Sequence, residues 1–169
     1  MPHPCDTPGL RETAAALLVS LTLAAPVHAQ TLREARELIV DKDFDAAHQA
    51  LRPLARAGNA DAEELIGVIY ALGLGVEQDH VRAFEWYLRS AMKGHPGAQS
   101  GVGWYYELGL GMAQPDRVRA YLWYRLSDIG GDPDAAISVE ELGKKMTAEE
   151  MEEAHKLIDD YRAWMYPFR

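Results

Sequence analysis

From residue 32 onward, apolar side chains recur at the three- and four-residue spacing of amphipathic helices. No stretch shows the strict alternation of a half-buried strand. Short breaks that contain glycine, asparagine, aspartate or lysine divide the pattern into helical segments. We therefore predict an all-α chain of about four antiparallel helix pairs. The expected helices are 32–40 and 44–57, 60–72 and 80–93, 96–108 and 117–129, and 134–142 with a last helix that opens at Thr147.

The two middle pairs carry the same residues at a fixed spacing. The first four positions, Gly67, Tyr70, Gly73 and Gly75, return 36 residues later as Gly103, Tyr106, Gly109 and Gly111. After one inserted residue near Pro115, the pair Trp86-Tyr87 returns 37 residues later as Trp123-Tyr124. A period of this length predicts stacked helical units, each of which can bury its apolar face only against its neighbours.

The repeated residue types have physical reasons. Glycine inside a helix is unfavourable by about 1 kcal/mol relative to alanine, so Gly67 and Gly103 indicate a close approach by a neighbouring helix. The two Gly-x-Gly segments, 73–75 and 109–111, predict turns that a Cβ would oppose. The repeated Trp-Tyr pairs are expected to fill the space between successive helix pairs. Asp79 and Asp116 are expected to cap the second helices.

These residues resemble the Sel-one-like repeat, a relative of the tetratricopeptide repeat. The motif A-x-x-x-L-G-x-x-Y-x-x-G-x-G is matched closely over residues 60–136, and more weakly over residues 32–58 and at the C-terminus. The resemblance implies a right-handed α/α solenoid. It also implies a role as a non-catalytic protein–protein interaction scaffold or adaptor, often in the bacterial cell envelope. It supplies no catalytic residues.

We predict five segments along the chain. They are a signal peptide (1–29), a degenerate N-terminal helix pair (30–58), two Sel-one-like repeats (59–95 and 96–132) and C-terminal capping helices (133–169). The first segment contains an uncharged apolar run at 14–25, too short to span a bilayer, and a small-x-small cleavage site that ends at Ala29. A periplasmic or secreted protein is therefore expected. The alternative is a cytoplasmic repeat adaptor with no cleaved signal.

Charge and reactive side chains narrow the function further. The chain has a net charge of −9, and about −8 remains after the predicted cleavage, which disfavours binding to nucleic acid. Cys5 is the one cysteine and precedes the cleavage site, so no thiol chemistry is expected in the mature chain. The histidines lack metal-ligand spacing, and we predict no metal, no cofactor and no membrane span in the mature chain. The alternative to a non-catalytic adaptor is a cell-wall-related hydrolase or a β-lactam-binding enzyme.

The expected partner is a protein or peptide, and the expected binding surface is the concave side, which the first helix of each pair lines in such solenoids. Ser100, Trp104 and Glu107 share one side of their helix by i, i+4, i+7 spacing. Trp104 stands where the preceding repeat has valine, so the repeat itself does not require an indole there. The predicted partner-binding residues are Glu64, Val68, Ser100, Trp104, Glu107 and Glu141.

Three further interpretations depend on packing that the sequence does not show. Trp104 either serves as an aromatic anchor for a partner or packs against a neighbouring helix. Adjacent acidic pairs such as Glu63-Glu64 are expected to form solvated faces. The apolar tail 164–168 is either a latch over the last helix pair or a second docking segment.

Overall fold

The computed structural model describes the backbone of residues 27–165 and the side chains of residues 31–161. This part of the chain is all-helical, which confirms the predicted fold class. The predicted signal sequence at 14–25 and the apolar tail 164–168 lie outside the residues whose side chains are described. The helices are α1 (Val27–Val40), α2 (Phe44–Arg56), α3 (Ala60–Leu72), α4 (His80–Ala91), α5 (Pro96–Leu108), α6 (Arg117–Ile129), α7 (Ala135–Gly143) and α8 (Ala148–Met165).

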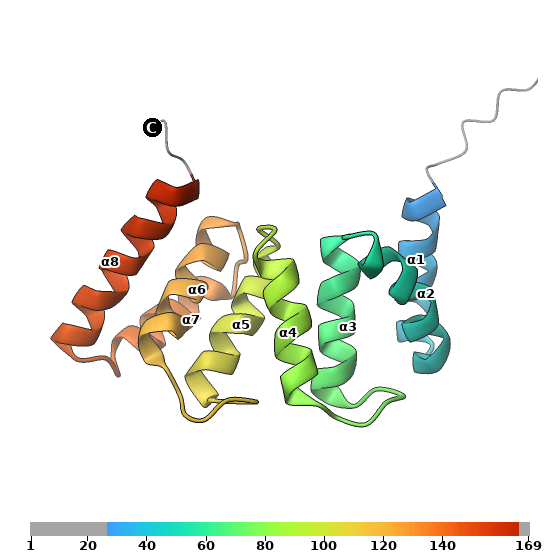
Figure 1. Cartoon of the computed structure of the whole chain (residues 1–169), viewed down its shortest axis with the longest axis horizontal. Coiled ribbons are helices and arrows are strands. Elements are labelled where there is room, and N and C mark those ends of the chain that lie inside the picture. Colours follow the sequence, from blue (N-terminus) through green and yellow to red (C-terminus); the bar gives the residue numbers. More distant parts are fainter. Residues whose placement is uncertain (1–26, 166–169) are drawn as a thin grey trace, which may run out of the picture.

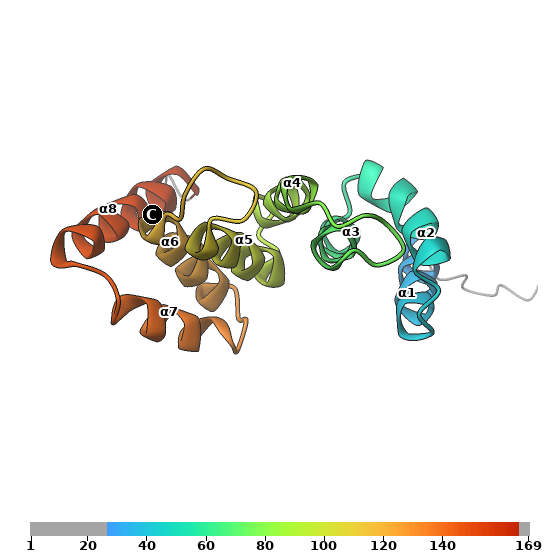
Figure 2. The ribbon, with the colours of Figure 1, turned by 90° about the horizontal axis from the view of Figure 1, so that it is seen from below.

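The helices stack in chain order into an elongated rod (Figure 1). Each of α1 to α6 packs against its neighbour in the chain, within a pair and between pairs. The buried apolar residues form several clusters spaced along the rod, as expected for a stack in which each unit contacts only its neighbours. In Figure 2, α1 and α7 near the two ends reach further to the lower side than α3 and α5 between them. The first helices therefore line the inner side of a curved rod.

The turns between the paired helices form as the repeated glycines predict. Gly73 and Gly109 end α3 and α5 in the left-handed conformation, with φ of 67° and 69°. The second helices then begin at aspartate caps. The carboxylate of Asp79 accepts a hydrogen bond from the backbone N–H of Arg82 at 2.9 Å, and Asp116 accepts the equivalent bond from Arg119 at 2.9 Å. Both predicted caps are confirmed, because turn and cap signals act over only a few residues.

The helical glycines accommodate an aromatic ring. A Cβ on Gly67 would lie 3.0 Å from a ring carbon of Tyr87, and one on Gly103 would lie 2.7 Å from the ring of Tyr124. The close approach predicted at these glycines therefore involves the second helix of the same repeat. The group that contacts each glycine is a tyrosine side chain of that helix. Tyr87 also lies against Gly101 of the next repeat, where a Cβ would be 3.1 Å away. The Tyr87 ring therefore packs against the first helices of two successive repeats.

The C-terminal end departs from the helix-pair pattern. Both α7 and α8 pack against α6, and residues of all three helices share one buried cluster. The predicted capping box at the start of α8 is confirmed: Glu150 N–H donates to the Thr147 hydroxyl at 3.2 Å, and Thr147 N–H donates to the Glu150 carboxylate at 2.8 Å. Ala154 is fully buried on the side of α8 that faces α6, while Glu152 and Glu153 are exposed. The rod thus ends in a helix with a polar outer face.

The two repeated tryptophans differ in burial. Trp123 is 7% exposed and belongs to a cluster with Ala91 and Val102, so it fills the space between repeats as predicted. Trp86 is only half-buried, although it packs against the cluster formed by α1, α2 and α3. The guanidinium of Arg89 lies 4.5 Å from the centre of the Trp86 ring. The prediction that both indoles fill inter-repeat space is thus met in full only at Trp123.

The prediction that Glu63 lies on a solvated face is wrong. Glu63 is 0% exposed, at the start of α3. Its Oε2 accepts a hydrogen bond from the Lys93 ammonium, and its Oε1 lies 3.3 Å from the Arg89 guanidinium without a well-aligned hydrogen bond. Arg89 belongs to the last turn of α4, the second helix of the same repeat, and Lys93 follows two residues after that helix ends. Their charges make it possible to bury the carboxylate, which would otherwise cost several kcal/mol.

Candidate protein-binding surface

The repeat register brings eight positions onto one side of the first helices. The positions of Glu64, Val68 and Leu72 on α3 recur on α5 as Ser100, Trp104 and Leu108, at an offset of 36 residues. On α7, the first two recur as Ile137 and Glu141, at a further offset of 37. We call these eight residues the first-helix face. Five of the six predicted partner-binding residues belong to it, and Glu107 does not.

Trp104 lies at the surface, at the centre of the first-helix face. Its side chain is 43% exposed. Its ring meets the ring of Tyr105 edge to face, with the centroids 5.5 Å apart, and Tyr105 is fully buried. One edge of the indole therefore packs on a buried ring, while the rest of its surface is exposed to solvent. Of the two interpretations of Trp104, this geometry fits the aromatic anchor.

Sequence reasoning missed three apolar residues of the same face. Leu72, Leu108 and Ile137 are 63%, 50% and 59% exposed. Leu72 and Leu108 lie one helical turn after Val68 and Trp104, so the repeat itself places them on the same side. Their recurrence next to the turn glycines was the available signal. Large apolar side chains gathered on one side are a feature of interaction sites, whereas isolated ones are ordinary.

Glu107 has partners inside the chain. Its Oε2 accepts a hydrogen bond from the Tyr124 hydroxyl at 3.0 Å, and its Oε1 accepts one from the Lys145 ammonium at 3.1 Å. Burial and the neighbouring Glu107 carboxylate raise the pKa of Tyr124 well above its ordinary value. Glu107 thus holds α5 against α6 and against the segment that follows α7. Both carboxylate oxygens of Glu107 are thus engaged within the chain, and for this reason we do not count it in the first-helix face.

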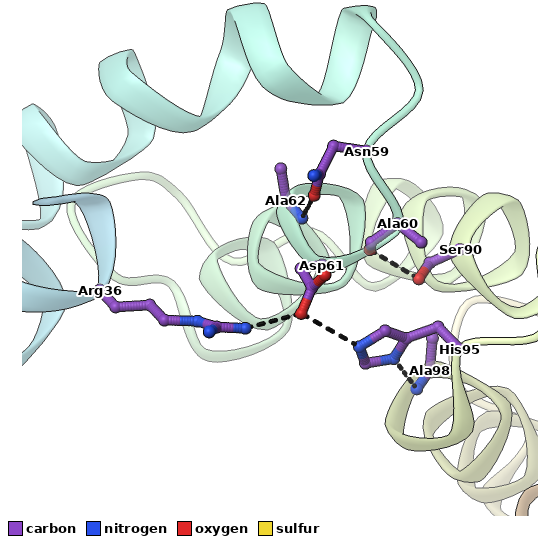
Figure 3. A network of polar contacts seen from close by, with 8 residues as sticks. All are labelled: Arg36, Asn59, Ala60, Asp61, Ala62, Ser90, His95 and Ala98. Carbon is purple, nitrogen blue, oxygen red and sulfur yellow. Dashed lines mark hydrogen bonds and ion pairs between the residues drawn. The ribbon is translucent and has the colours of Figure 1, made fainter. Parts of the chain in front are cut away.

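A polar network borders this face near the N-terminal end (Figure 3). Asp61 at the start of α3 binds the Arg36 guanidinium of α1 at 2.6 Å, and its Oδ1 lies 3.7 Å from Nε2 of His95. The other ring nitrogen of His95, Nδ1, accepts a hydrogen bond from the Ala98 backbone N–H at 3.2 Å and so caps α5. One aspartate therefore connects the first helices of three successive units.

Glu64 lies beside this network and is held there at a cost in stability. Burial is the main cause that raises the pKa of its carboxyl, and Asp61 acts in the same direction, while His95 and Arg36 oppose them. Because the folded chain binds this proton more tightly than the unfolded chain, the ionised carboxylate destabilises the fold. The penalty is absent below the ordinary carboxyl pKa and grows as the pH rises through the raised value.

We expect the Glu64→Gln variant to melt at a higher temperature than the parent chain at pH 7. The difference should shrink towards zero near pH 3, where the parent carboxyl is also neutral. Thermal unfolding measured at both pH values tests this. Glu141→Gln, which removes an exposed carboxylate from the same face, is the control and should leave the melting temperature nearly unchanged. A lower melting temperature for Glu64→Gln at pH 7 would contradict this account of Glu64.

Two further properties of the described residues bear on other kinds of function. Among residues 27–165, no helix is both long and apolar enough to cross a membrane. The same part of the chain contains no group of three or more histidine, cysteine, aspartate or glutamate side chains placed to hold a metal ion. The geometry that this region does offer is a curved surface with exposed apolar side chains at its centre and carboxylates near both ends.

The fold and its repeat register define a class of protein: an α-solenoid of tandem helix pairs. The family model for the Sel1 repeat matches residues 60–95 and 96–127. Residues 60–95 and 96–127 are therefore two Sel1 repeats, as the spacing of glycine, tyrosine and tryptophan indicated. Sel1 repeats mediate protein–protein interaction, and proteins of this family are generally non-catalytic adaptors.

Known proteins resemble this chain over its repeats. It is 39% identical over 72 residues to the ERAD-associated E3 ubiquitin-protein ligase component HRD3A of Arabidopsis thaliana, covering 42% of this chain and 10% of that protein. A Sel1 repeat protein from Oxalobacter formigenes superimposes with a TM-score of 0.62 at 32% identity, over 66% of this chain and 45% of the other. A protective antigen of uropathogenic Escherichia coli with an SLR fold superimposes with a TM-score of 0.75 at 22% identity. The match covers 84% of this chain and 33% of that protein. The chain thus spans less than half the length of each of these proteins.

Proposed function

We propose that this chain is an exported, non-catalytic adaptor of the bacterial cell envelope. In this proposal it binds a protein or peptide partner through the first-helix face. The observation that carries the proposal is the set of exposed apolar side chains on this face, with Trp104 at its centre between Leu72 and Ile137. The face is preformed by rigid helices, so a partner would lose little affinity to ordering this chain.

The chemistry of the face suggests what such a partner presents. Trp104, Leu108 and Ile137 offer apolar contact area, and tryptophan is among the residues that contribute most to binding when it is buried by a partner. Glu64 and Glu141 add negative charge on either side of it. A partner segment with apolar side chains flanked by lysine or arginine would complement this arrangement.

We expect Trp104→Ala to weaken partner binding by about 30-fold or more, the effect of losing a central anchor worth at least ~2 kcal/mol. The free energy of unfolding should change little, because the indole is 43% exposed. A photo-crosslinking residue at position 108 of the full chain, which keeps Trp104 and lies on the same face, would first trap the partner in bacterial cells. Calorimetric titration of the purified pair would then give the affinities of the parent and the variant.

Ile129→Ala is the matched control for this experiment. Ile129 is 57% exposed but lies at the end of α6, away from the first-helix face. A crosslinker at position 129 should trap no partner, and its alanine variant should bind normally. If Trp104→Ala binds as tightly as the parent chain, the first-helix face is not the binding surface. If it is destabilised as strongly as a core variant, Trp104 serves packing.

Export has its own test. The apolar run at 14–25 and the cleavage site ending at Ala29 support it, as does the place of that site in the fold: cleavage there would remove only the first three residues of α1. Ala35, which is fully buried in the N-terminal cluster, would be retained. N-terminal sequencing of the native protein should give Gln30 as the first residue. A native chain that begins at Met1 would support the cytoplasmic alternative.

A further inference from the structure

A second candidate site lies between α2, α3 and α4. It is a pocket of about 280 Å³, lined by His48, Arg52, Arg56, Ile66, Tyr70 and Trp86. The three basic side chains come from α2, where their i, i+4, i+8 spacing places them on one side of the helix. The apolar and aromatic residues come from α3 and α4. Because α2 and α4 are second helices, this pocket opens away from the first-helix face.

Two arginines of this pocket lack counterions within the described residues. Arg52 and Arg56 are exposed, and neither forms an ion pair or hydrogen bond in that part of the chain. The other cations near the pocket rings are paired: Arg82 with Asp79 at 3.3 Å, and Arg89 with Glu63 at 3.3 Å. On a chain with a net charge of −9, two guanidinium groups without ion-pair partners give this pocket a local positive charge, which attracts anions.

The next repeat shows what this space looks like when packing alone determines it. At an offset of 36 residues, His48 and Arg52 correspond to Phe84 and Leu88, and Arg56 corresponds to Met92. Phe84 and Leu88 belong to the apolar cluster that covers Trp123, which is 7% exposed. At the first position, His48 and Arg52 replace these apolar side chains, and Trp86 stays half-buried beside an open pocket. The stack itself therefore does not require basic residues at these positions.

The pocket walls have two kinds of chemistry. Tyr70 and Trp86 offer aromatic rings, and His48 meets the ring of Tyr70 edge to face with the centroids 5.6 Å apart. Burial, with the charge of Arg52 as the second cause, lowers the pKa of His48 below its ordinary value. Positive charge at neutral pH therefore comes from the two arginines, whose planar guanidinium groups match the geometry of a carboxylate.

We propose that this pocket binds an acidic peptide segment of a protein partner. A carboxylate side chain pairs with Arg52 and Arg56, and an adjacent apolar or aromatic side chain packs on Tyr70 and Trp86. The volume of about 280 Å³ suits one or two side chains, since sites for whole small molecules start at roughly this size. This inference rests on the proposed adaptor function and gives the chain a second contact, of opposite charge preference to the first-helix face.

A displayed library of random peptides, panned in parallel on the full chain and on an Arg52→Gln/Arg56→Gln variant, tests the proposal. The full chain should enrich peptides with aspartate or glutamate next to an apolar or aromatic residue, and the variant should not. One enriched peptide, made with a fluorescent label, should lose at least tenfold in affinity when its acidic residue becomes the amide. Arg52→Lys should retain part of the binding, because it keeps the charge but loses the planar fork.

The controls separate this site from the first-helix face. Both arginine variants should keep the parent melting temperature, because the two side chains are exposed. The Trp104→Ala variant should bind the acidic peptide normally. If the enriched peptides bind less tightly to Trp104→Ala but equally well to the arginine variant, the proposed adaptor function still holds. The proposal that the pocket binds an acidic peptide would then be wrong. Failure to enrich acidic peptides, equal binding of the amide peptide, or displacement by inorganic phosphate more readily than by the free peptide would also overturn it.

Discussion

Replacing Trp123 with alanine should lower the free energy of unfolding by about 3–5 kcal/mol, the usual effect of truncating a buried aromatic residue to alanine. The side chain is 7% exposed and contacts three parts of the rod. It clusters with Ala91 at the end of α4 and with Val102 of α5. The centroid of its ring lies 6.2 Å from the ring centroid of Tyr161 on α8. Its loss would leave a cavity where the first repeat, the second repeat and the cap meet.

Urea denaturation followed by circular dichroism measures this effect. Because a total stability of about 5–15 kcal/mol is typical, the variant should unfold at a much lower urea concentration or be largely unfolded without urea. Hydrogen exchange should show the greatest loss of protection in α5, α6 and α8, since each unit of a solenoid is stabilised mainly by its neighbours.

Trp86→Ala provides the matched control, because it makes the same change at the equivalent position of the preceding repeat. Trp86 is half-buried, and part of its surface is covered by a single stacked guanidinium, that of Arg89. Its truncation should therefore cost clearly less than that of Trp123. If both variants lose the same stability, or Trp86→Ala loses more, burial does not explain the difference between the two repeats.

The features that the sequence predicted well depend on local interactions. A glycine in the left-handed conformation or an aspartate cap acts within one helical turn, so Gly73, Gly109, Asp79 and Asp116 were enough to place the turns of the two repeats. The glycines at 67 and 103 indicated close packing but not the group responsible. That group is a tyrosine about 20 residues further along, and its ring orientation depends on how two helices pack.

The features that the sequence predicted poorly depend on distant partners. The burial of Glu63 requires Lys93, which is 30 residues away. The only local hint was that the equivalent position in the next repeat is Gln99, a second buried polar residue. Likewise, nothing near Glu107 in the sequence shows that Tyr124 and Lys145 occupy its carboxylate. The pocket beside Arg52 and Arg56 was missed because it forms only when three helices come together.

The two repeats differ in a coordinated way around the buried carboxylate. Glu63, Arg89 and Lys93 of the first repeat correspond to Gln99, Leu126 and Gly130 of the second. Where the carboxylate becomes a neutral amide, both cations are also absent. Gln99 is 5% exposed, and its amide donates to the Ala91 carbonyl at 3.3 Å. The position therefore accepts a buried polar side chain without charge, and the cations matter only when the acid is present.

Replacing Lys93 with methionine should destabilise the chain by about 3 kcal/mol. Removing one partner of a buried ion pair typically costs about 3–5 kcal/mol, because the remaining charge is buried without compensation. The lower end of that range applies here, since Arg89 still lies 3.3 Å from the carboxylate and the Lys93 side chain is 40% exposed. Methionine keeps most of the aliphatic length of lysine, so the change isolates the charge and its hydrogen bonds to Glu63 and the Gly58 carbonyl.

The double variant Glu63→Gln/Lys93→Met separates this explanation from a loss of packing. It copies the neutral amide of the second repeat, so it should be more stable than Lys93→Met alone, although it carries one more substitution. A double-mutant cycle from urea denaturation, with Glu63→Gln as the fourth corner, gives the coupling energy of the pair. If the double variant is less stable than Lys93→Met, the buried carboxylate is not what makes the loss of Lys93 costly, and the lysine acts through its contact with Gly58.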